Sequence, residues 1–310
     1  MTDPQVLVSV IIPCYNHGIY LDDAIESVRQ SGPAGTEILV VDDGSSDPET
    51  LLKLEELEKN GIRVIRKKNG GVASARNVGF EAAKGKYIVP LDADNQLLLP
   101  YFSEGVSFLE QNPEVAMVYG DATIFGDKNG TWVNHPVQLE EILFENYIDN
   151  CALVRKSAWV SVNGYDEKIP LSTREDWYFW ICLLEKGWKF HYINQFCFAY
   201  RFLENSKVRT RFSLISNRIL VLSYIYQKQE AAIRAFALSS EISEKTADDL
   251  IFRLCKQLAY YHFGWGSVAK GYRFLIHGFT NPRQLAETAK LAIGWPWLRY
   301  RQRNPLEGGT

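Results

Sequence analysis

The first 120 residues alternate short apolar runs with amphipathic segments, and few folds accommodate such a pattern. The apolar runs predict strands at residues 6–13, 37–41, 62–66, 87–91 and 115–119. The segments between them predict helices at residues 20–30, 48–59, 72–83 and 100–111. Strands and helices that alternate at this spacing form a mostly parallel sheet with helices on its faces, joined by right-handed crossovers. We therefore expect an α/β, Rossmann-like central sheet.

The remainder of the chain is less regular and then helical. We predict a short helix at residues 139–146, a helix at 177–186 and a returning strand at 189–200. Beyond residue 211 the apolar spacing is that of helices, which we expect at residues 213–238, 244–262 and 284–293. A domain boundary near residue 210 is therefore expected, with an α/β domain over 1–210 and a C-terminal helical extension over 211–310.

Charge divides the chain at nearly the same place. Residues 1–200 hold 17 Lys and Arg against 29 Asp and Glu, a net charge of −12. Residues 201–310 hold 17 against 8, a net charge of +9. Such asymmetry suggests separate tasks for the two parts. An acidic first part is poorly suited to nucleic acid, and the sequence has no nucleic-acid-binding motif.

Cysteine usage and the N-terminus bear on the compartment. The five cysteines are scattered and form no Cys-x-x-Cys pair, which argues against a disulfide framework or a zinc site and favours a reducing compartment. The first residues do not combine a basic region with an apolar stretch, so we expect no signal peptide. No apolar segment approaches the roughly 18 residues that span a bilayer. A cytoplasmic protein is expected.

The most informative motif is Asp92-Ala93-Asp94, which directly follows the apolar run at 87–91. Open α/β sheets hold ligands at the carboxyl ends of their strands. Mg²⁺ often takes one or two carboxylates together with substrate phosphates, so the motif is a candidate metal–diphosphate site. The alternative is an ordinary polar turn.

Two further motifs end the first and second predicted strands. Residues 12–16, Ile-Pro-Cys-Tyr-Asn, are either a strand stop followed by a turn or the floor of a site for a nucleotide base. Residues 40–47 read Val-Val-Asp-Asp-Gly-Ser-Ser-Asp, in which Asp47 can cap the helix that begins at Pro48. Asp43 is the candidate for binding the hydroxyls or base of a nucleotide.

A glycine-rich motif opens the third predicted helix. Residues 69–77 read Asn-Gly-Gly-Val-Ala-Ser-Ala-Arg-Asn, which is neither a Walker A loop nor Gly-x-Gly-x-x-Gly. Glycines allow a backbone to approach a ligand closely, and a helix N-terminus favours anions. Arg76 lies in the early turns of this helix. It could bind a diphosphate, neutralise a nearby carboxylate such as Asp92, or do both.

The last motif, Arg174-Glu175-Asp176-Trp177, precedes the helix predicted at 177–186. Ser172 or Thr173 is the expected N-cap. Acidic residues at a helix start commonly complement the helix dipole. The functional alternative makes one carboxylate a general base, with Trp177 as an apolar wall against a sugar face.

Taken together and in this order, these motifs closely resemble those of the family 2 glycosyltransferases, which have a GT-A fold, over residues 6–206. The resemblance implies transfer of a sugar, with inversion, from a nucleotide-diphosphate donor that is expected to carry uridine. It implies a donor half at about 1–120 and an acceptor half at about 121–210. The acceptor is expected to be a saccharide or a lipid-linked molecule in surface polysaccharide or glycoconjugate synthesis.

The resemblance also implies roles for individual residues. The positions that match donor-contacting positions of the family are Pro13, Tyr15, Asp43, Asn69, Arg76, Asp92 and Ala93. Asp94 matches the carboxylate expected on Mn²⁺ or Mg²⁺, and Asp176 matches the base that deprotonates the acceptor hydroxyl. Glu175 lies beside this base in the acceptor site, and Trp177 is expected to bind the acceptor.

The chain departs from the family pattern after the returning strand. Many relatives carry Tyr-Arg-x-His-x-x-Ser there, with the His near the metal or diphosphate, whereas this chain has Leu203 at the matching position. A leucine cannot ligate a metal, so water, diphosphate oxygens or Asn205 would have to complete the metal shell. Weaker metal dependence is expected.

Two alternative functions remain open from the sequence, as do three roles for the C-terminal part. A sugar nucleotidyltransferase would usually show a Gly-rich basic loop after the first strand, which residues 13–16 do not resemble. A non-catalytic nucleotide-sugar binding protein is favoured by Leu203 but disfavoured by the retention of Asp94 and Asp176. The basic, aromatic region 211–310 either packs on the catalytic domain, attaches to an anionic membrane surface, or forms homo-oligomers.

Overall fold

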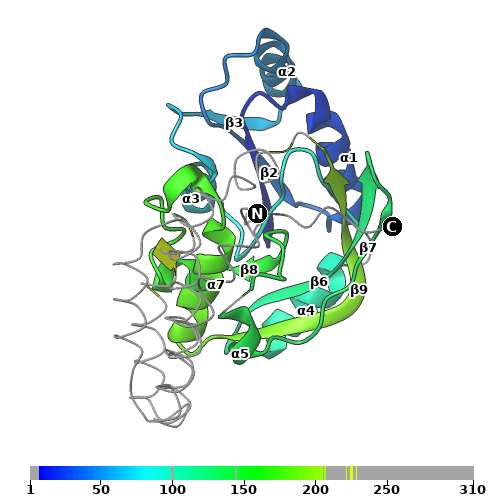
Figure 1. Ribbon diagram of the computed structural model, residues 1–310. Coiled ribbons are helices and arrows are strands. Elements are labelled where there is room, and N and C mark those ends of the chain that lie inside the picture. Colours follow the sequence, from blue (N-terminus) through cyan, green and yellow to red (C-terminus); the bar gives the residue numbers. More distant parts are fainter. Residues whose placement is uncertain are drawn as a thin grey trace, which may run out of the picture. The chain divides into compact units, whose positions relative to one another are not determined.

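The computed structural model describes residues 7–98, 101–143, 145–204 and 206, together with Val221, Tyr224, Ile225 and Lys228. The chain divides into two compact units, Met1–Thr210 and Arg211–Thr310. The first unit holds all the helices and strands given below (Figure 1). The helices expected beyond residue 211 lie outside the described residues, apart from the four positions named above.

Four parallel strands form one half of the sheet, in the order β3-β2-β1-β4. Their bounds are Val8–Cys14 for β1, Glu37–Asp42 for β2, Arg63–Arg66 for β3 and Tyr87–Pro90 for β4. The register pairs Cys14 with Asp42 and Asp42 with Arg66. Ile11 pairs with Pro90. The carboxyl ends of these strands therefore meet at one edge, and the loops that follow them share it.

Further strands extend this sheet to nine strands, in the order β3-β2-β1-β4-β8-β6-β9-β5 with β7 on β6. Strands β6 and β9 pair in parallel, whereas β8, β5 and β7 each pair antiparallel with their neighbours. The additional strands are β5 (Gln96–Leu97), β6 (Val115–Gly126), β7 (Gly130–Trp132), β8 (Leu153–Arg155) and β9 (Lys189–Phe202). The predicted fifth strand begins at Val115 but continues to Gly126. It does not pair with β4, because the short strand β8 lies between them, antiparallel to both.

Helices α1 to α4 follow the strands as the sequence predicts, whereas α5 is shorter than the predicted helix at 139–146 and α6 lies where no helix is predicted. Their bounds are Leu21–Ser31 for α1, Pro48–Lys59 for α2, Val72–Ala82 for α3, Tyr101–Gln111 for α4, Leu139–Ile142 for α5, Lys156–Ser161 for α6 and Glu175–Glu185 for α7. Short 3₁₀ turns occupy Gly18–Tyr20 (η1) and Pro170–Ser172 (η2). None of the helices in the described ranges combines the length and apolar character that a bilayer-spanning helix needs.

Alternate residues of β1 face opposite helical layers. Val10 and Ile12 belong to a buried cluster that also contains side chains of α1, α2 and α4. Ile11 points to the other face, where a Cβ added to Gly79 of α3 would lie 2.2 Å from its Cγ2. Helices therefore cover both faces of the sheet, as predicted (Figure 1).

The contact at Gly79 also positions the candidate site. With no side chain at this position, the backbone of α3 rests directly on β1. Arg76 lies three residues earlier on the same helix, near the carboxyl edge of the sheet. The height of α3 above the sheet thus determines where the Arg76 guanidinium lies.

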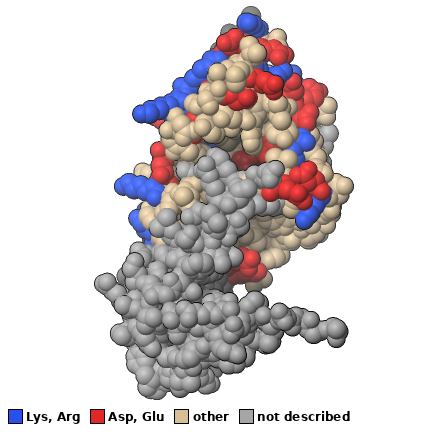
Figure 2. Space-filling model, turned by 45° about the horizontal axis from the view of Figure 1, so that its top comes forward, with Lys and Arg blue, Asp and Glu red and all other residues tan. Residues whose placement is uncertain are grey.

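Both signs of charge are interspersed over the first unit. On the face drawn in Figure 2, Lys and Arg side chains of the described part lie among Asp and Glu side chains, apart from one group of neighbouring Lys and Arg at the upper left. Several are paired, as in the contacts of Lys53 with Asp22 and Glu56 at 2.8 and 2.7 Å.

The predicted cap of α2 is confirmed. The Asp47 carboxylate accepts hydrogen bonds from the backbone N of Thr50 at 2.8 Å and from its hydroxyl at 2.7 Å. Pro48 occupies the first helical turn, where its missing N–H leaves no bond unmade. The cap fixes the start of α2 and, with it, the loop that follows β2.

We predict that Asp47→Ala lowers the free energy of unfolding by about 1 kcal/mol, since an N–H at the helix start loses its acceptor. Chemical denaturation of the purified protein measures the change. Ser46→Ala is the matched control, because Ser46 is exposed and contributes its backbone N–H to Asn16. Equal stabilities for the two variants would contradict a stabilising cap.

Candidate active site

The turn after β1 is tied to the loop after β2. The Asn16 side-chain oxygen accepts hydrogen bonds from the backbone N–H groups of Ser46 at 2.8 Å and Asp47 at 3.0 Å. Asn16 itself has a left-handed backbone with φ of 56°. Tyr15 is 37% exposed beside it, and Pro13 is half-buried at the end of β1. The predicted donor contacts of Pro13 and Tyr15 thus fall on a well-anchored surface turn.

Asp43 organises the glycine-rich loop. Its buried carboxylate accepts hydrogen bonds from Lys67 Nζ at 2.7 Å and from the backbone N–H groups of Gly70 and Gly71 at 2.9 and 2.8 Å. The Asn69 side-chain amide donates to the Asp43 backbone oxygen at 2.9 Å. Two glycine N–H groups that could have faced a ligand therefore bind a carboxylate of the chain itself. This structural role of Asp43 is absent from the sequence analysis.

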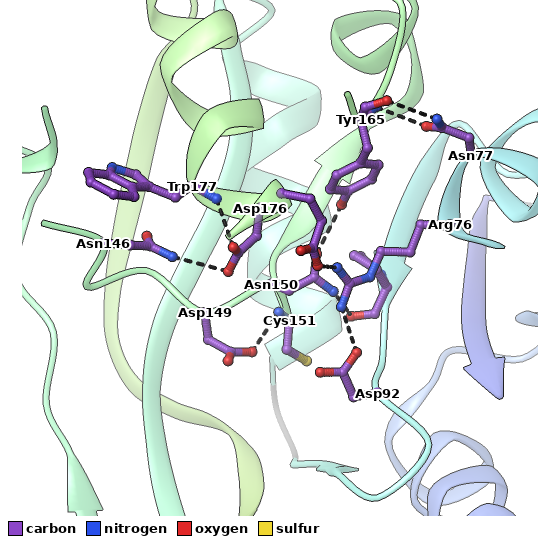
Figure 3. A network of polar contacts seen from close by, with 12 residues as sticks. Arg76, Asn77, Asp92, Asn146, Asp149, Asn150, Cys151, Tyr165, Asp176 and Trp177 are labelled. Atoms are coloured by element: carbon purple, nitrogen blue, oxygen red, sulfur yellow. Dashed lines mark hydrogen bonds and ion pairs between the residues drawn. The ribbon is translucent and has the colours of Figure 1, made fainter. Parts of the chain in front are cut away.

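Arg76 lies between the two halves of the first unit. Its guanidinium pairs with Asp92 at 2.7 Å, from Nη2 to Oδ1, and also forms an ion pair with Glu175 (Figure 3). The Asn150 amide, turned so that its oxygen faces Arg76, accepts from Nη2 and Nε at 3.1 Å each. The Tyr165 ring lies 5.7 Å from the guanidinium carbon. The predicted neutralisation of Asp92 by Arg76 is therefore present in the structure.

Charge compensation at Arg76 is strong. Burial alone would lower the pKa of Arg76, but the carboxylates of Asp92 and Glu175 outweigh it and raise the pKa above its ordinary value. The side chain is only 3% exposed. Arg76 is thus buried and fixes the positions of Asp92 and Glu175. Its predicted contact with a donor diphosphate stays a prediction.

The Asp92–Asp94 turn is braced from β9. Arg201 donates from Nε to the Asp94 backbone oxygen at 2.9 Å, and its backbone N–H donates to the Asn95 side chain at 2.9 Å. Asn95 N–H closes the turn on the Asp92 carbonyl at 2.9 Å. Burial, followed by the charge of Asp92, raises the pKa of Asp94 to about 6. Ala93 is buried between the two carboxylates.

The donor atoms around Asp94 limit how a metal could be held. Among the described residues, no group of three or more His, Cys, Asp or Glu could hold an ion. Leu203 is half-buried and apolar, and Asn205 lies outside the described residues. Asp94, partly desolvated at the strand end, fits the single-carboxylate mode in which Mg²⁺ keeps several waters and shares substrate phosphates.

Helix α7 begins two residues earlier than predicted, and its expected cap is wrong. It starts at Glu175, and its N-cap is Arg174, which has a left-handed backbone with φ of 64° and makes no side-chain capping bond. Neither Ser172 nor Thr173 caps the helix, because the left-handed residue turns the chain between them and the first helical turn. As a result Glu175 is buried against Arg76, whereas Asp176 remains partly exposed.

Asp176 is held at both carboxylate oxygens. Its Oδ2 accepts from the Asn146 side-chain amide at 3.1 Å, and its Oδ1 accepts from the Trp177 backbone N–H at 2.8 Å (Figure 3). Burial raises the pKa of Asp176, and Arg174 and Arg76 oppose the shift. A partly exposed carboxylate with a raised pKa has the properties of a general base.

The segment before β8 contributes residues that the sequence analysis missed. Asn146, Asp149 and Asn150 all belong to the polar network of Figure 3. The Asp149 carboxylate accepts from the Cys151 backbone N–H at 2.8 Å, and burial and the charge of Asp92 raise its pKa to about 8. In the sequence, the three polar residues among the five positions 146–150, directly before the apolar run at 151–154, could have indicated a functional segment.

Trp177 does not present a face to a ligand. It is 2% exposed, and its indole N–H donates to the Ile142 backbone oxygen at 2.5 Å. The expectation that it forms a wall against an acceptor sugar is therefore corrected: the first turn of α7 points Asp176 outward and the adjacent Trp177 into the core.

Comparison with known proteins decides the family. The model of the family described as glycosyl transferase family 2 matches residues 9–202. The chain belongs to that family. Bacillus subtilis (strain 168) TuaG, named as a teichuronic acid biosynthesis glycosyltransferase, is 29% identical over 213 residues, which cover 66% of this chain and 83% of TuaG. The Escherichia coli UDP-Glc:alpha-D-GlcNAc-diphosphoundecaprenol beta-1,3-glucosyltransferase WfgD is 28% identical over 183 residues, 58% of this chain and 70% of WfgD.

A solved structure supports the fold. The crystal structure of S. aureus TarS 1-349 matches with a TM-score of 0.59 and 17% identity, over 84% of this chain and 73% of that one. At this identity the likeness concerns the fold alone. Together the findings confirm the predicted α/β GT-A fold and show that the chain is a glycosyltransferase, which sets aside the nucleotidyltransferase and non-catalytic alternatives.

We predict that Arg76→Met lowers the free energy of unfolding by about 3–5 kcal/mol, because it leaves the buried Glu175 carboxylate without its cation. Denaturant unfolding measures the loss. Arg63→Met is the control, since Arg63 is 46% exposed and pairs with Glu37 at 3.2 Å. That exposed pair should contribute no more than about 1 kcal/mol. Equal free energies of unfolding for the two variants would show that the buried ion pair contributes no more to stability than the exposed one.

Proposed function

We propose that this enzyme transfers a sugar, with inversion, from a UDP-sugar to a hydroxyl group of a saccharide or lipid-linked acceptor during surface polysaccharide or glycoconjugate synthesis. The observation that carries the proposal is the partly exposed Asp176 carboxylate, which lies in the first turn of α7 beside the Arg76 network and has a raised pKa. Asp92 and Asp94 lie at the end of β4, in the donor half of the sheet.

The chemistry follows from this arrangement. Asp176 accepts the proton of the acceptor hydroxyl while the oxygen of that hydroxyl forms a bond to the anomeric carbon of the donor sugar. The bond from that carbon to the nucleoside diphosphate breaks on the opposite face, so one displacement inverts the configuration. One base suffices for this step, and no nucleophile of the enzyme takes part. Glu175 stays paired with Arg76 and maintains the position of the first turn of α7.

The names of similar proteins support the donor and acceptor classes. TarS was crystallised with UDP-GlcNAc, and WfgD is named for UDP-Glc as donor. The acceptor in the name of WfgD is a diphosphoundecaprenol-linked sugar, and the name of TuaG refers to teichuronic acid. For this chain we propose a uridine nucleotide donor, bound by the donor half at 1–120, and an acceptor bound by the half at 121–210.

The charge of the C-terminal part supports a location for the reaction. Residues 201–310 carry a net charge of +9 and include the aromatic, basic segment Trp-Pro-Trp-Leu-Arg-Tyr-Arg-Gln-Arg at 295–303. Such a region favours peripheral attachment to an anionic membrane surface, where lipid-linked acceptors reside. We propose this attachment for a cytoplasmic enzyme. Co-sedimentation with anionic vesicles at low salt that is lost at high salt would support it, and no binding at low salt would refute it. Homo-oligomer formation through 211–310 is the alternative, which the molar mass in solution tests.

A divalent cation completes the proposed donor site. Mn²⁺ or Mg²⁺ would be held by Asp94 and the donor diphosphate, with Asp92 and Ala93 beside the donor. When bound, the cation neutralises charge on the departing nucleoside diphosphate.

Asp176→Asn should reduce kcat by a factor of about 10²–10⁴, because the amide cannot accept the acceptor proton. Donor affinity should stay within about twofold of the wild type, since Asp176 lies in the acceptor half. Steady-state kinetics and calorimetric titration with UDP-sugars measure the two quantities. Glu185→Gln, at the exposed last residue of the same helix, is the control. Normal turnover by Asp176→Asn would refute the assignment of the base.

Excess EDTA should lower transfer, and added Mn²⁺ or Mg²⁺ should restore it, with a weaker dependence than in relatives because Leu203 stands where the family pattern has a histidine. A thermal-shift panel of nucleotide sugars with and without Mn²⁺ provides a second measurement, because a donor that binds only the folded protein raises its melting temperature. Undiminished activity in EDTA, with equal donor shifts in both conditions, would remove the cation from the proposed mechanism.

A further inference from the structure

The proposed base receives a hydrogen bond from a distant part of the chain. Asn146, on the segment between α5 and β8, donates from its side-chain amide to Asp176 Oδ2 at 3.1 Å. The other carboxylate oxygen accepts from the backbone N–H of Trp177, its own neighbour, at 2.8 Å. The bond from Trp177 lies within α7 and moves with the start of that helix. Among the hydrogen bonds of the described residues, the one from Asn146 fixes the carboxylate relative to the rest of the acceptor half.

The orientation of the Asn146 amide is determined by its surroundings. Its side-chain oxygen accepts from the Ile148 backbone N–H at 3.3 Å, which leaves the nitrogen directed at Asp176 (Figure 3). An amide in this orientation offers the carboxylate a donor and not a second acceptor. The donor role of Asn146 toward the base therefore follows from two independent hydrogen bonds.

Two tryptophans of α7 hold the segment on either side of Asn146. The Trp177 indole N–H donates to the Ile142 backbone oxygen at 2.5 Å, and the Trp180 indole N–H donates to the Ile148 backbone oxygen at 3.3 Å. Both indoles are buried. The segment that carries Asn146 is thereby fixed to the helix that carries Asp176, which keeps donor and base in register.

We propose that Asn146 is a positioning residue that aims the Asp176 carboxylate at the acceptor hydroxyl and favours its ionised form. A neutral donor suits this task, because it orients the base and lowers its proton affinity less than an adjacent cation would. The inference rests on the proposed role of Asp176 as base.

Other charged and titratable groups also face Asp176 and set its baseline. The groups whose charges influence the pKa of Asp176, or whose pKa its charge influences, are Arg174, Arg76, Glu175, Asp92, Asp149 and Tyr165. Arg76 is already engaged by Asp92 and Glu175. A change at Asn146 leaves all of these groups in place, so a shift in the titration of the base can be assigned to the lost hydrogen bond.

The test is the pH dependence of kcat/KM in three variants. Transfer requires an ionised base, so activity rises with pH through the pKa of Asp176 and is lost below it. Asn146→Ala should move this acid limb upward by about one pH unit and lower kcat about tenfold. Asn146→Asp keeps the side-chain shape but replaces the donor by a second carboxylate, so the limb should move further upward. Glu145→Ala, the exposed neighbour, should match the wild type.

The outcomes separate the inference from the proposed function. If folded Asn146→Ala and Asn146→Asp both retain the wild-type acid limb while Asp176→Asn is inactive, the base stands and the role of Asn146 is refuted. If Asp176→Asn is fully active, the proposed base fails instead. Circular dichroism and the melting temperature of each variant check folding, and Asn146→Asp alone carries the test if Asn146→Ala does not fold.

Discussion

The buried guanidinium of Arg76 is the interaction on which the site depends. A charge inside a protein must be paired, and removing one partner of a buried pair is costly. Arg76 meets this requirement with Asp92 at the end of β4 and Glu175 at the start of α7, groups that are 83 residues apart in the sequence. The two ion pairs therefore fix the end of β4 relative to the start of α7. The position of Asp176, next to Glu175, is a consequence of this pairing.

Pairing with Arg76 divides the acidic residues of the site into two kinds. Asp92 and Glu175 are tied to the cation and serve the architecture as well as any ligand. Asp94, Asp149 and Asp176 form no ion pair with Arg76 in the described part of the chain, and burial raises the pKa of each of them, as it also raises that of Glu175. Carboxylates that differ in this way can take different tasks in one reaction. The division also explains why adjacent acidic residues, such as Glu175 and Asp176, need not share a role.

Local patterns allowed much of the fold to be predicted. The strand–helix alternation places β1 to β4 and α1 to α3 within about two residues of their observed bounds, and Asp47 caps α2 as its neighbours indicate. Features that depend on contacts between distant parts of the chain were not predicted from the sequence. Strand β8 has three residues, too few for a recognisable period, and its place between β4 and β6 depends on tertiary pairing. The left-handed Arg174 and the inward turn of Trp177 likewise reflect packing that propensity does not encode.

The charge balance at the carboxyl edge constrains how this enzyme can hold a diphosphate. Lys67 is paired with Asp43, Arg76 with Asp92 and Glu175, and Arg201 with Asp23 at 2.8 Å. The N–H groups of Gly70 and Gly71 donate to the Asp43 carboxylate and are therefore not directed at a phosphate. These cations and amides already serve carboxylates of the chain, so an anionic donor gains little from them. A divalent cation at Asp94 would supply positive charge there. Because Leu203 stands where the family pattern predicts a histidine, the donor's own oxygens would be the main remaining ligands of such an ion.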